Sequence, residues 1–244
     1  MKICHFIIAA TCCLAVSCLT ARSQVSAELK AFQDAAGSGS ILFRGKQAGS
    51  YDRRANGNPY WYSDTFVPGE IVFEGNFYDD ILVNVDAVAG LALVRKEDTP
   101  IAISLNPGNV SVIRTDASTF VGIGPGHPSL PEGFYEVFGS GPEMVYKHVS
   151  KKLQTSTQYM NGDPIGYYDS DYNPEYTSYF ALTKTYYFMD GNGVFSRIRG
   201  RKSLIRKFPE RRGEIRRSLA DKRLDLPGAD FDACCREILR ITAR

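Results

Sequence analysis

The sequence predicts a mainly β fold: an antiparallel meander forming a sandwich or an open barrel, with a short N-terminal helix and a C-terminal helical appendage, α+β overall. Between residues 41 and 198, short segments rich in Val, Ile, Phe and Tyr alternate with turn residues, which is typical of sequential antiparallel strands. Apolar residues at helical spacing gather near the two ends. With 43% hydrophobic and 23% charged residues, the composition excludes a disordered chain and a polytopic membrane protein.

Residues 1–23 have the features of a secretory signal peptide. A positive start precedes an apolar run from Ile3 to Leu19, and a small-residue cleavage site stands before Gln24. Two alternatives stay open. One is a membrane anchor, which would need about 20 unbroken apolar residues. The other is lipoprotein processing at Cys18, because the residues before it loosely resemble the lipoprotein signal.

The mature chain divides into a β domain over residues 24–199 and a helical segment over residues 200–244. The β domain begins with an amphipathic helix over residues 24–39, which ends at a Gly-Ser-Gly sequence. Short strands are then expected at residues 41–44, 70–77, 81–85, 90–95, 101–105, 110–114 and 120–123. Apolar and polar residues alternate in several of them, as in a sheet with one packed face.

Two hairpins are predicted in the second half of the β domain. The first has the turn Gly139–Pro142 between strands at residues 134–138 and 144–149. The second has the turn Asp190–Gly193, between strands at residues 178–189 and 194–198. The tyrosine-rich stretch from Lys151 to Tyr176 lacks a clear period, which predicts a long loop between the hairpins.

The C-terminal segment is helical and basic. Its apolar residues follow helical spacing with breaks at Pro209 and Pro227, which predicts two or three short helices. Residues 1–196 contain 14 basic and 20 acidic residues, whereas residues 197–223 contain 12 basic and 3 acidic residues. The overall charge of +2 therefore conceals a basic segment attached to an acidic body.

The cysteines do not predict a disulfide framework. Four of the six lie in the expected signal peptide, which leaves Cys234 and Cys235. Neighbouring cysteines form only a strained disulfide, because their side chains diverge. The pair is therefore interpreted as two small, buried, apolar side chains.

Several segments resemble, in order and spacing, a group of uncharacterised small secreted proteins of Gram-negative bacteria. The resemblance rests on Asn56–Trp61, Phe66–Phe73, Asp80–Asp86, Gly133–Val137, Val145–Lys147, a Tyr-Tyr-Phe hairpin and Asp230–Asp232. It covers most of the mature chain and implies a β-rich domain in the periplasm or associated with the outer membrane. It implies no activity and assigns no functional residues.

Aromatic and basic residues are the main binding candidates. Tyr60, Trp61 and Tyr62 offer large contact areas at a low cost in side-chain entropy, although aromatic residues also fill cores. The basic candidates stand between the apolar positions of the helical segment, where a solvated helix face puts them. They are Arg211, Arg212, Arg216 and Arg217.

His127 is a further binding candidate, because it follows the Gly-rich stretch Gly122–Gly126. A phosphate cradle would need a helix next, but prolines follow, which favours a flexible or ligand-gating loop. A secreted hydrolase could use His127 as its base. The chain lacks the Gly-x-Ser-x-Gly elbow of such enzymes, and the mature chain has one other histidine, His148.

The sequence predicts no cofactor, no metal site and no catalytic residue. Asp169-x-Asp171-x-Asn173 begins like a calcium loop, but Pro174 and Phe180 occupy the positions that need Gly and Glu. The two histidines of the mature chain have no zinc-site spacing.

These patterns favour an exported envelope protein that acts as a non-enzymatic binding module. The expected partners are an envelope protein, a glycan or an anionic membrane surface. We expect no nucleic acid partner, because the chain is exported, and no transmembrane span after signal cleavage. The alternative is a secreted hydrolase of unknown type that uses the His127 loop.

Overall fold

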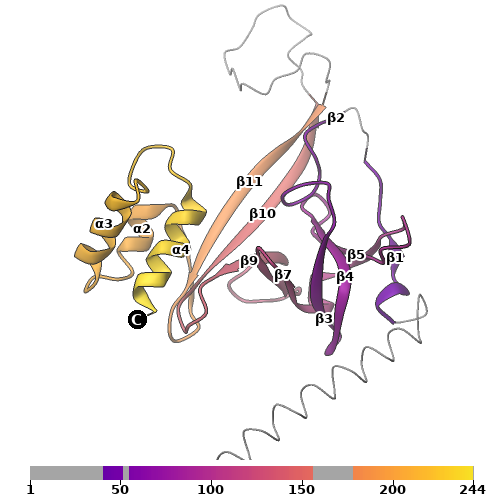
Figure 1. Cartoon of the computed structure of the whole chain (residues 1–244), viewed down its shortest axis with the longest axis horizontal. Coiled ribbons are helices and arrows are strands. Elements are labelled where there is room, and N and C mark those ends of the chain that lie inside the picture. Colours follow the sequence, from indigo (N-terminus) through magenta and orange to yellow (C-terminus); the bar gives the residue numbers. More distant parts are fainter. Residues whose placement is uncertain (1–40, 52–54, 156–177, 244) are drawn as a thin grey trace, which may run out of the picture.

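The computed structural model describes residues 41–51, 55–155 and 178–243, and it confirms the predicted fold class (Figure 1). The protein is mainly β, with a mostly antiparallel sheet of twelve strands and a helical C-terminal part. The signal peptide, the helix expected over residues 24–39 and the Asp169 motif lie outside the described residues.

The strands follow the expected order along the chain. They are β1 Lys46–Gln47, β2 Ala55–Asn56, β3 Val67–Phe73, β4 Asn76–Asp86, β5 Leu91–Arg95, β6 Ile103–Leu105, β7 Val110–Thr115, β8 Thr119–Ile123, β9 Gly133–Phe138, β10 Met144–Thr155, β11 Ser178–Met189 and β12 Phe195–Ile198. The helices are the 3-10 turns η2 Ile41–Phe43 and η3 Pro107–Asn109, and the α-helices α2 Arg201–Ile205, α3 Arg212–Asp221 and α4 Phe231–Thr242.

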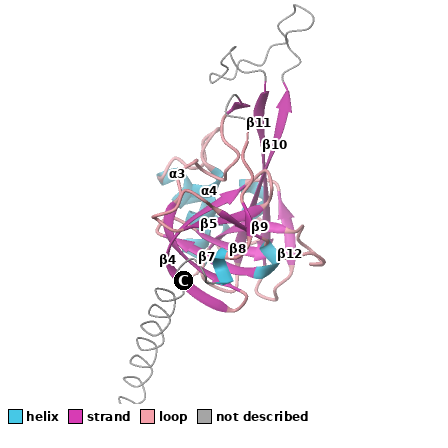
Figure 2. Cartoon of the chain, turned by 90° about the vertical axis from the view of Figure 1, so that its right-hand side faces the viewer, coloured by secondary structure: helices cyan, strands magenta, loops and turns pink. Residues whose placement is uncertain are grey.

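The strands form one open sheet in the order β1-β6-β5-β4-β3-β7-β8-β9-β10-β11-β12, with β2 pairing in parallel to β11. The sheet curls, so that strands far apart in this order come into contact. Strand β5 contacts β9, and the main-chain N–H of Lys151 on β10 donates to the carbonyl of Ala87, which follows β4. Strands β10 and β11 extend from the curled part as a long two-stranded ribbon (Figures 1 and 2).

Three local predictions were wrong. Residues 41–44 contain η2 instead of a strand, because the turn buries Leu42 completely. The expected strand over residues 70–77 is divided by a tight turn at Glu74 and Gly75, whose φ angles of 49° and 79° suit a hairpin. Residues 151–155, expected to begin a long loop, instead continue β10 in register with β11. The rest of that expected loop lies outside the described residues.

The helices and the last four strands share a hydrophobic core. Figure 1 places α2, α3 and α4 on one side of the β10–β11 ribbon. The sheet contributes Phe138, Val145, Phe188 and Ile198, and the helical part contributes Leu204, Ile205, Phe208, Ile215, Leu219, Cys234, Cys235, Ile238, Leu239 and Ile241. The C-terminal segment is thus anchored on the sheet by buried side chains.

Cys234 and Cys235 are both buried in this core and unpaired. Burial raises the pKa of each thiol above its usual value. This agrees with the interpretation of the pair as small apolar side chains. Of the helices in the described part of the chain, none combines the length and the hydrophobicity that a bilayer crossing requires.

Candidate binding site

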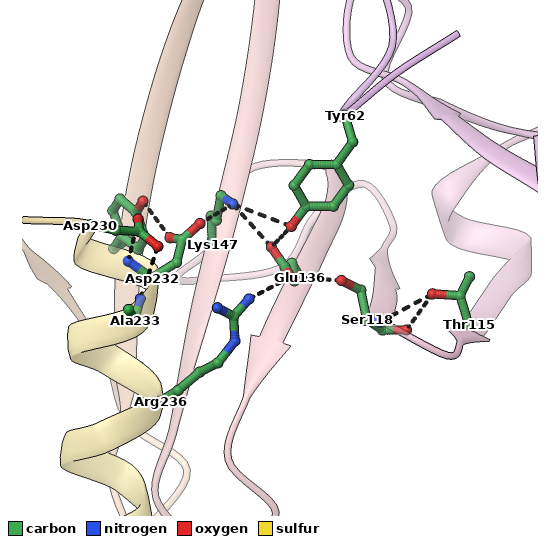
Figure 3. A network of polar contacts seen from close by, with 10 residues as sticks. Tyr62, Thr115, Ser118, Glu136, Lys147, Asp230, Asp232, Ala233 and Arg236 are labelled. Carbon is green, nitrogen blue, oxygen red and sulfur yellow. Dashed lines mark hydrogen bonds and ion pairs between the residues drawn. The ribbon is translucent and has the colours of Figure 1, made fainter. Parts of the chain in front are cut away.

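A buried lysine on β10 is the centre of a charged network that joins the sheet to α4 (Figure 3). Lys147 is 1% exposed. Its Nζ donates to Oε2 of Glu136 at 3.0 Å and to Oδ2 of Asp232 at 2.5 Å. Glu136 stands directly opposite Lys147 on β9, and Asp232 belongs to the first turn of α4. The network therefore connects three elements that the sequence separates.

Glu136 receives further partners from both sides. The hydroxyl of Tyr62 donates to its Oε2 at 2.5 Å, and the hydroxyl of Ser118 donates to its Oε1 at 2.8 Å. The guanidinium of Arg236 lies 3.6 Å from Oε1. Because Glu136 is only 1% exposed, these contacts replace the water that a carboxylate would otherwise bind.

Asp232 is held at the start of α4 by its neighbours. Asp230 caps the helix, since its carboxylate accepts the backbone N–H groups of Asp232 and Ala233. The hydroxyl of Tyr186 on β11 donates to Oδ1 of Asp232 at 2.7 Å. Asp232 therefore connects α4 to β10 through Lys147 and to β11 through Tyr186.

The network shifts the titration of its members. Burial alone would lower the pKa of Lys147, but its hydrogen bond to Asp232 and its contacts with Glu136 outweigh burial, so that the pKa is raised. Burial and the hydrogen bond to Glu136 raise the pKa of Tyr62, and burial and the hydrogen bond to Asp232 raise that of Tyr186. Lys147 is therefore charged and both phenols are neutral at physiological pH.

A cavity of about 410 Å³ opens beside this network. Its apolar lining residues are Trp61, Val67, Val83, Val85, Ile113, Ala117 and Phe120. Its polar lining residues are Tyr62, Ser63, Thr65, Asn84, Thr115, Ser118 and Arg236. Tyr62, Ser118 and Arg236 all contact Glu136, so the network holds one wall of the cavity in place.

The structure places two of the three predicted aromatic residues at this cavity. Trp61 is buried and packs edge-to-face on Phe120, with ring centroids 5.2 Å apart. Tyr62 is about half exposed and contacts the network. Tyr60 does not line the cavity: it bridges to Asp86, and its carbonyl accepts a hydrogen bond from Lys151. The backbone bonds of Tyr60 and Trp61 fix this segment against the end of β4.

Neither histidine forms a catalytic pair among the described residues. Nδ1 of His127 accepts the backbone N–H groups of Ser129 and Leu130, and its ring packs edge-to-face on Phe195. His148 stacks beside Tyr135, and burial lowers its pKa. No side chain of Ser, Asp or Glu within the described ranges is hydrogen-bonded to either ring. The hydrolase alternative gains no support.

The glycines before His127 have a packing role. A Cβ on Gly122 would lie 2.2 Å from the carbonyl oxygens of Pro107 and Val110, and one on Gly124 would lie 3.0 Å from the Cα of Gly108. These two glycines therefore allow β8 to approach η3 closely, which accounts for this part of the Gly-rich stretch without a phosphate.

The basic candidates on α3 differ in their surroundings. Arg211 donates from Nη1 to the carbonyl of Ile241 at 2.5 Å and so joins the start of α3 to the end of α4. Arg212, Arg216 and Arg217 are exposed, as predicted for a solvated helix face. None of the four lines the cavity beside Trp61.

Comparison of the chain with protein-family models, with curated proteins and with solved structures finds no match in any of the three.

Sequence reasoning missed Glu136, Lys147, Asp232 and Arg236, yet two of them left a signal. Glu136 is two residues from Phe134 and from Phe138, so the three share one face of β9. Lys147 shares one face of β10 with Val145 and Val149 in the same way. A charge at an inward position on each of two paired strands indicates a buried ion pair, because one face of such strands otherwise packs on a core. Asp232 and Arg236 on α4 have no comparable signal, because no local sequence pattern indicates which strand a helix packs against.

Proposed function

We propose that this protein is an exported binding protein that holds a small, largely apolar molecule with one acidic group and catalyses no reaction on it. The observation that carries the proposal is the cavity of about 410 Å³ lined by Trp61, Phe120 and Arg236. Small-molecule sites typically have volumes of about 300 to 1,000 Å³. A medium-chain fatty acid, with an apolar chain and one carboxylate, is a ligand of this chemistry.

Arg236 supports an acidic group on the ligand. Its side chain is 52% exposed, and it makes a single long ion contact with Glu136, at 3.6 Å. A guanidinium has five N–H donors and binds carboxylates in a bidentate manner. Donors therefore remain for a ligand carboxylate at this end of the cavity, while the aromatic and branched side chains match an apolar chain.

The lining residues favour binding over catalysis. Within the described part of the chain, the cavity is lined by no His, Cys, Asp, Glu or Lys. Ser118 has a carboxylate partner in Glu136, but that carboxylate is also bound by Tyr62 and Lys147. A serine nucleophile needs a base that is able to take its proton, and an occupied carboxylate is poorly suited to this.

Trp61 provides the test, because it is the only tryptophan in the sequence. Titration with dodecanoate below its micelle concentration should change the fluorescence of Trp61 in a saturable way. Arg236→Gln should weaken dodecanoate binding about tenfold while leaving dodecanol binding unchanged, since hydrogen bonds to charged groups contribute about 1.5–3 kcal/mol.

A cavity-filling variant supplies the matched control. Ala117→Phe places a ring in the cavity and should abolish binding, whereas Ala220→Phe, at an exposed position on α3 away from the cavity, should not. The binding proposal fails if the wild-type protein gives no saturable response, or if both phenylalanine variants bind equally well.

Export is part of the same proposal and is supported by the signal-like pattern of residues 1–23. Fractionation of the native host should place the protein in the envelope, with a mature N-terminus at Gln24. Mass spectrometry distinguishes the two kinds of processing, because a lipoprotein would begin at a modified Cys18. A full-length chain in the cytoplasm would contradict export.

A further inference from the structure

A second cavity, of about 420 Å³, lies between α2 and α3 and has a strongly basic lining. Five cationic side chains line it, with one acidic residue, Asp225. The cations are Arg201, Lys202 and Arg206 from the α2 region and Arg212 and Arg216 from α3. It shares no lining residue with the apolar cavity at Trp61. We call it the basic groove.

The five cations of the basic groove outnumber its one acidic residue, Asp225. Among the described residues, none of the five forms an ion pair, whereas nearby Lys222 and Arg240 are both paired with Glu237. Arg201 is also oriented, because its Nη1 donates to the carbonyl of Leu224 at 2.7 Å. Five like charges close to a single carboxylate repel one another, so an anionic ligand would relieve this repulsion.

The basic surface continues beyond the groove. Arg201 also lines a neighbouring cavity of about 530 Å³, together with Lys184 on β11, Arg197 on β12 and Arg199. No acidic residue lines this cavity within the described ranges. The two cavities therefore form a basic face that extends from α2 and α3 to the last two strands, which is larger than one phosphate ion requires.

We propose that this basic face docks on an anionic lipid surface, with lipid phosphate groups in the basic groove. Cations that surround exposed apolar side chains are typical of proteins that bind at a membrane interface. Leu226, at the rim of the neighbouring cavity, is 52% exposed and provides such an apolar contact. Single-stranded nucleic acid is less well matched, because its bases stack on aromatic rings. None of the described residues of the basic groove is aromatic, and the two rings at the neighbouring cavity, Tyr186 and Phe231, pack edge-to-face on each other.

Vesicle co-sedimentation of the wild-type protein is the first test. The protein should bind phosphatidylcholine vesicles that contain phosphatidylglycerol, bind pure phosphatidylcholine weakly, and lose binding at high salt. Equal binding to both vesicles would overturn the proposal. So would binding to inorganic phosphate without binding to vesicles, or tighter binding to a single-stranded oligonucleotide than to the vesicles.

Charge-matched variants then locate the contact. The triple change R206Q/R212Q/R216Q should lower the partition coefficient by roughly a hundredfold, at about fivefold for each cation near an anionic surface. The control R44Q/K46Q/K152Q removes three exposed cations of the β part and should bind as the wild type does. R206K/R212K/R216K keeps the charge and should also bind. Unchanged binding by the groove variant, or an equal loss in the control, would overturn the location.

Discussion

Replacing Lys147 by Met tests whether the buried network holds α4 on the sheet. Nζ of Lys147 lies 3.0 Å from Glu136 and 2.5 Å from Asp232, and the side chains are 2%, 2% and 11% exposed, respectively. Methionine keeps the apolar stem but removes the charge, so both carboxylates stay buried without their cation. Loss of one partner of a buried ion pair costs roughly 3–5 kcal/mol. We expect the free energy of unfolding in urea, followed by circular dichroism, to fall by about this amount.

The pH dependence identifies the cause of that loss. In Lys147→Met, Glu136 and Asp232 stay buried without the lysine, so taking up a proton should relieve the cost of their buried charge in the folded variant. The folded variant then binds protons at a pH where the unfolded chain is still ionised, so its stability should rise between about pH 7 and pH 5. In the wild type, the raised pKa of Lys147 means that its stabilising contribution is lost only in alkaline solution.

Two further variants make this prediction refutable. Lys152→Met changes an exposed lysine on the same strand and should alter stability by about 0.5 kcal/mol or less. Adding Glu136→Gln to Lys147→Met should restore part of the loss, because one of the two buried negative charges disappears. A loss below about 1 kcal/mol, or a loss that does not depend on pH, would refute the structural role of the network.

Three other predictions concern α3, α4 and the β11 residue Tyr186, which is hydrogen-bonded to α4. Glu237→Gln should lower stability by about 1–2 kcal/mol at neutral pH. Hydrogen bonds from Arg240, Lys222 and Ser218 hold the pKa of Glu237 far below its usual value despite burial, so the difference from wild type in urea melts should begin to shrink below about pH 4 and should decrease further with each step to lower pH. Ile215→Ala, at a fully buried position, should cost about 2–5 kcal/mol in the same melts, whereas an equally stable variant would contradict the shared core. Tyr186→Phe should leave the number of phenols that ionise below about pH 11 unchanged in an absorbance titration, because burial and Asp232 raise the pKa of Tyr186 well above its usual value.

The fold class follows from local patterns, and the errors occur where tertiary contacts override them. Alternation and turn residues were sufficient for both predicted hairpins, because a strand with one packed face repeats every two residues. The end of β10 lacks this repeat: residues 152–155 are all exposed, and they pair with β11 through the backbone and through a hydrogen bond from Tyr179 to Gln154. Leu42 is fully buried but belongs to a single 3-10 turn, which is too short for a repeating pattern of apolar residues to identify it.

The candidate site was predictable only in part. Trp61 and Tyr62 were identified as aromatic binding residues, and both line the cavity. Their partners lie far away in the sequence: the hydrogen bond from Tyr62 to Glu136 spans 74 residues. Such a contact depends on how the whole sheet curls, and the curvature of a sheet cannot be predicted from composition or from the local spacing of residues. The Arg cluster was visible as charge, but its concave arrangement required the positions of α2 and α3.

The position of Asp232 explains why a charged network occupies this place instead of apolar residues. A buried ion pair adds little stability compared with well-packed apolar side chains, but it is directional, because an unpaired charge left by a slipped helix is costly. Asp232 and Arg236 are four residues apart and therefore lie on the same face of α4. When Asp232 binds Lys147, Arg236 lies one helical turn further along α4, where it contacts Glu136 and lines the cavity. The network thus sets the register of α4 on the sheet, and with it the position of Arg236, the one cation among the described residues that line the cavity.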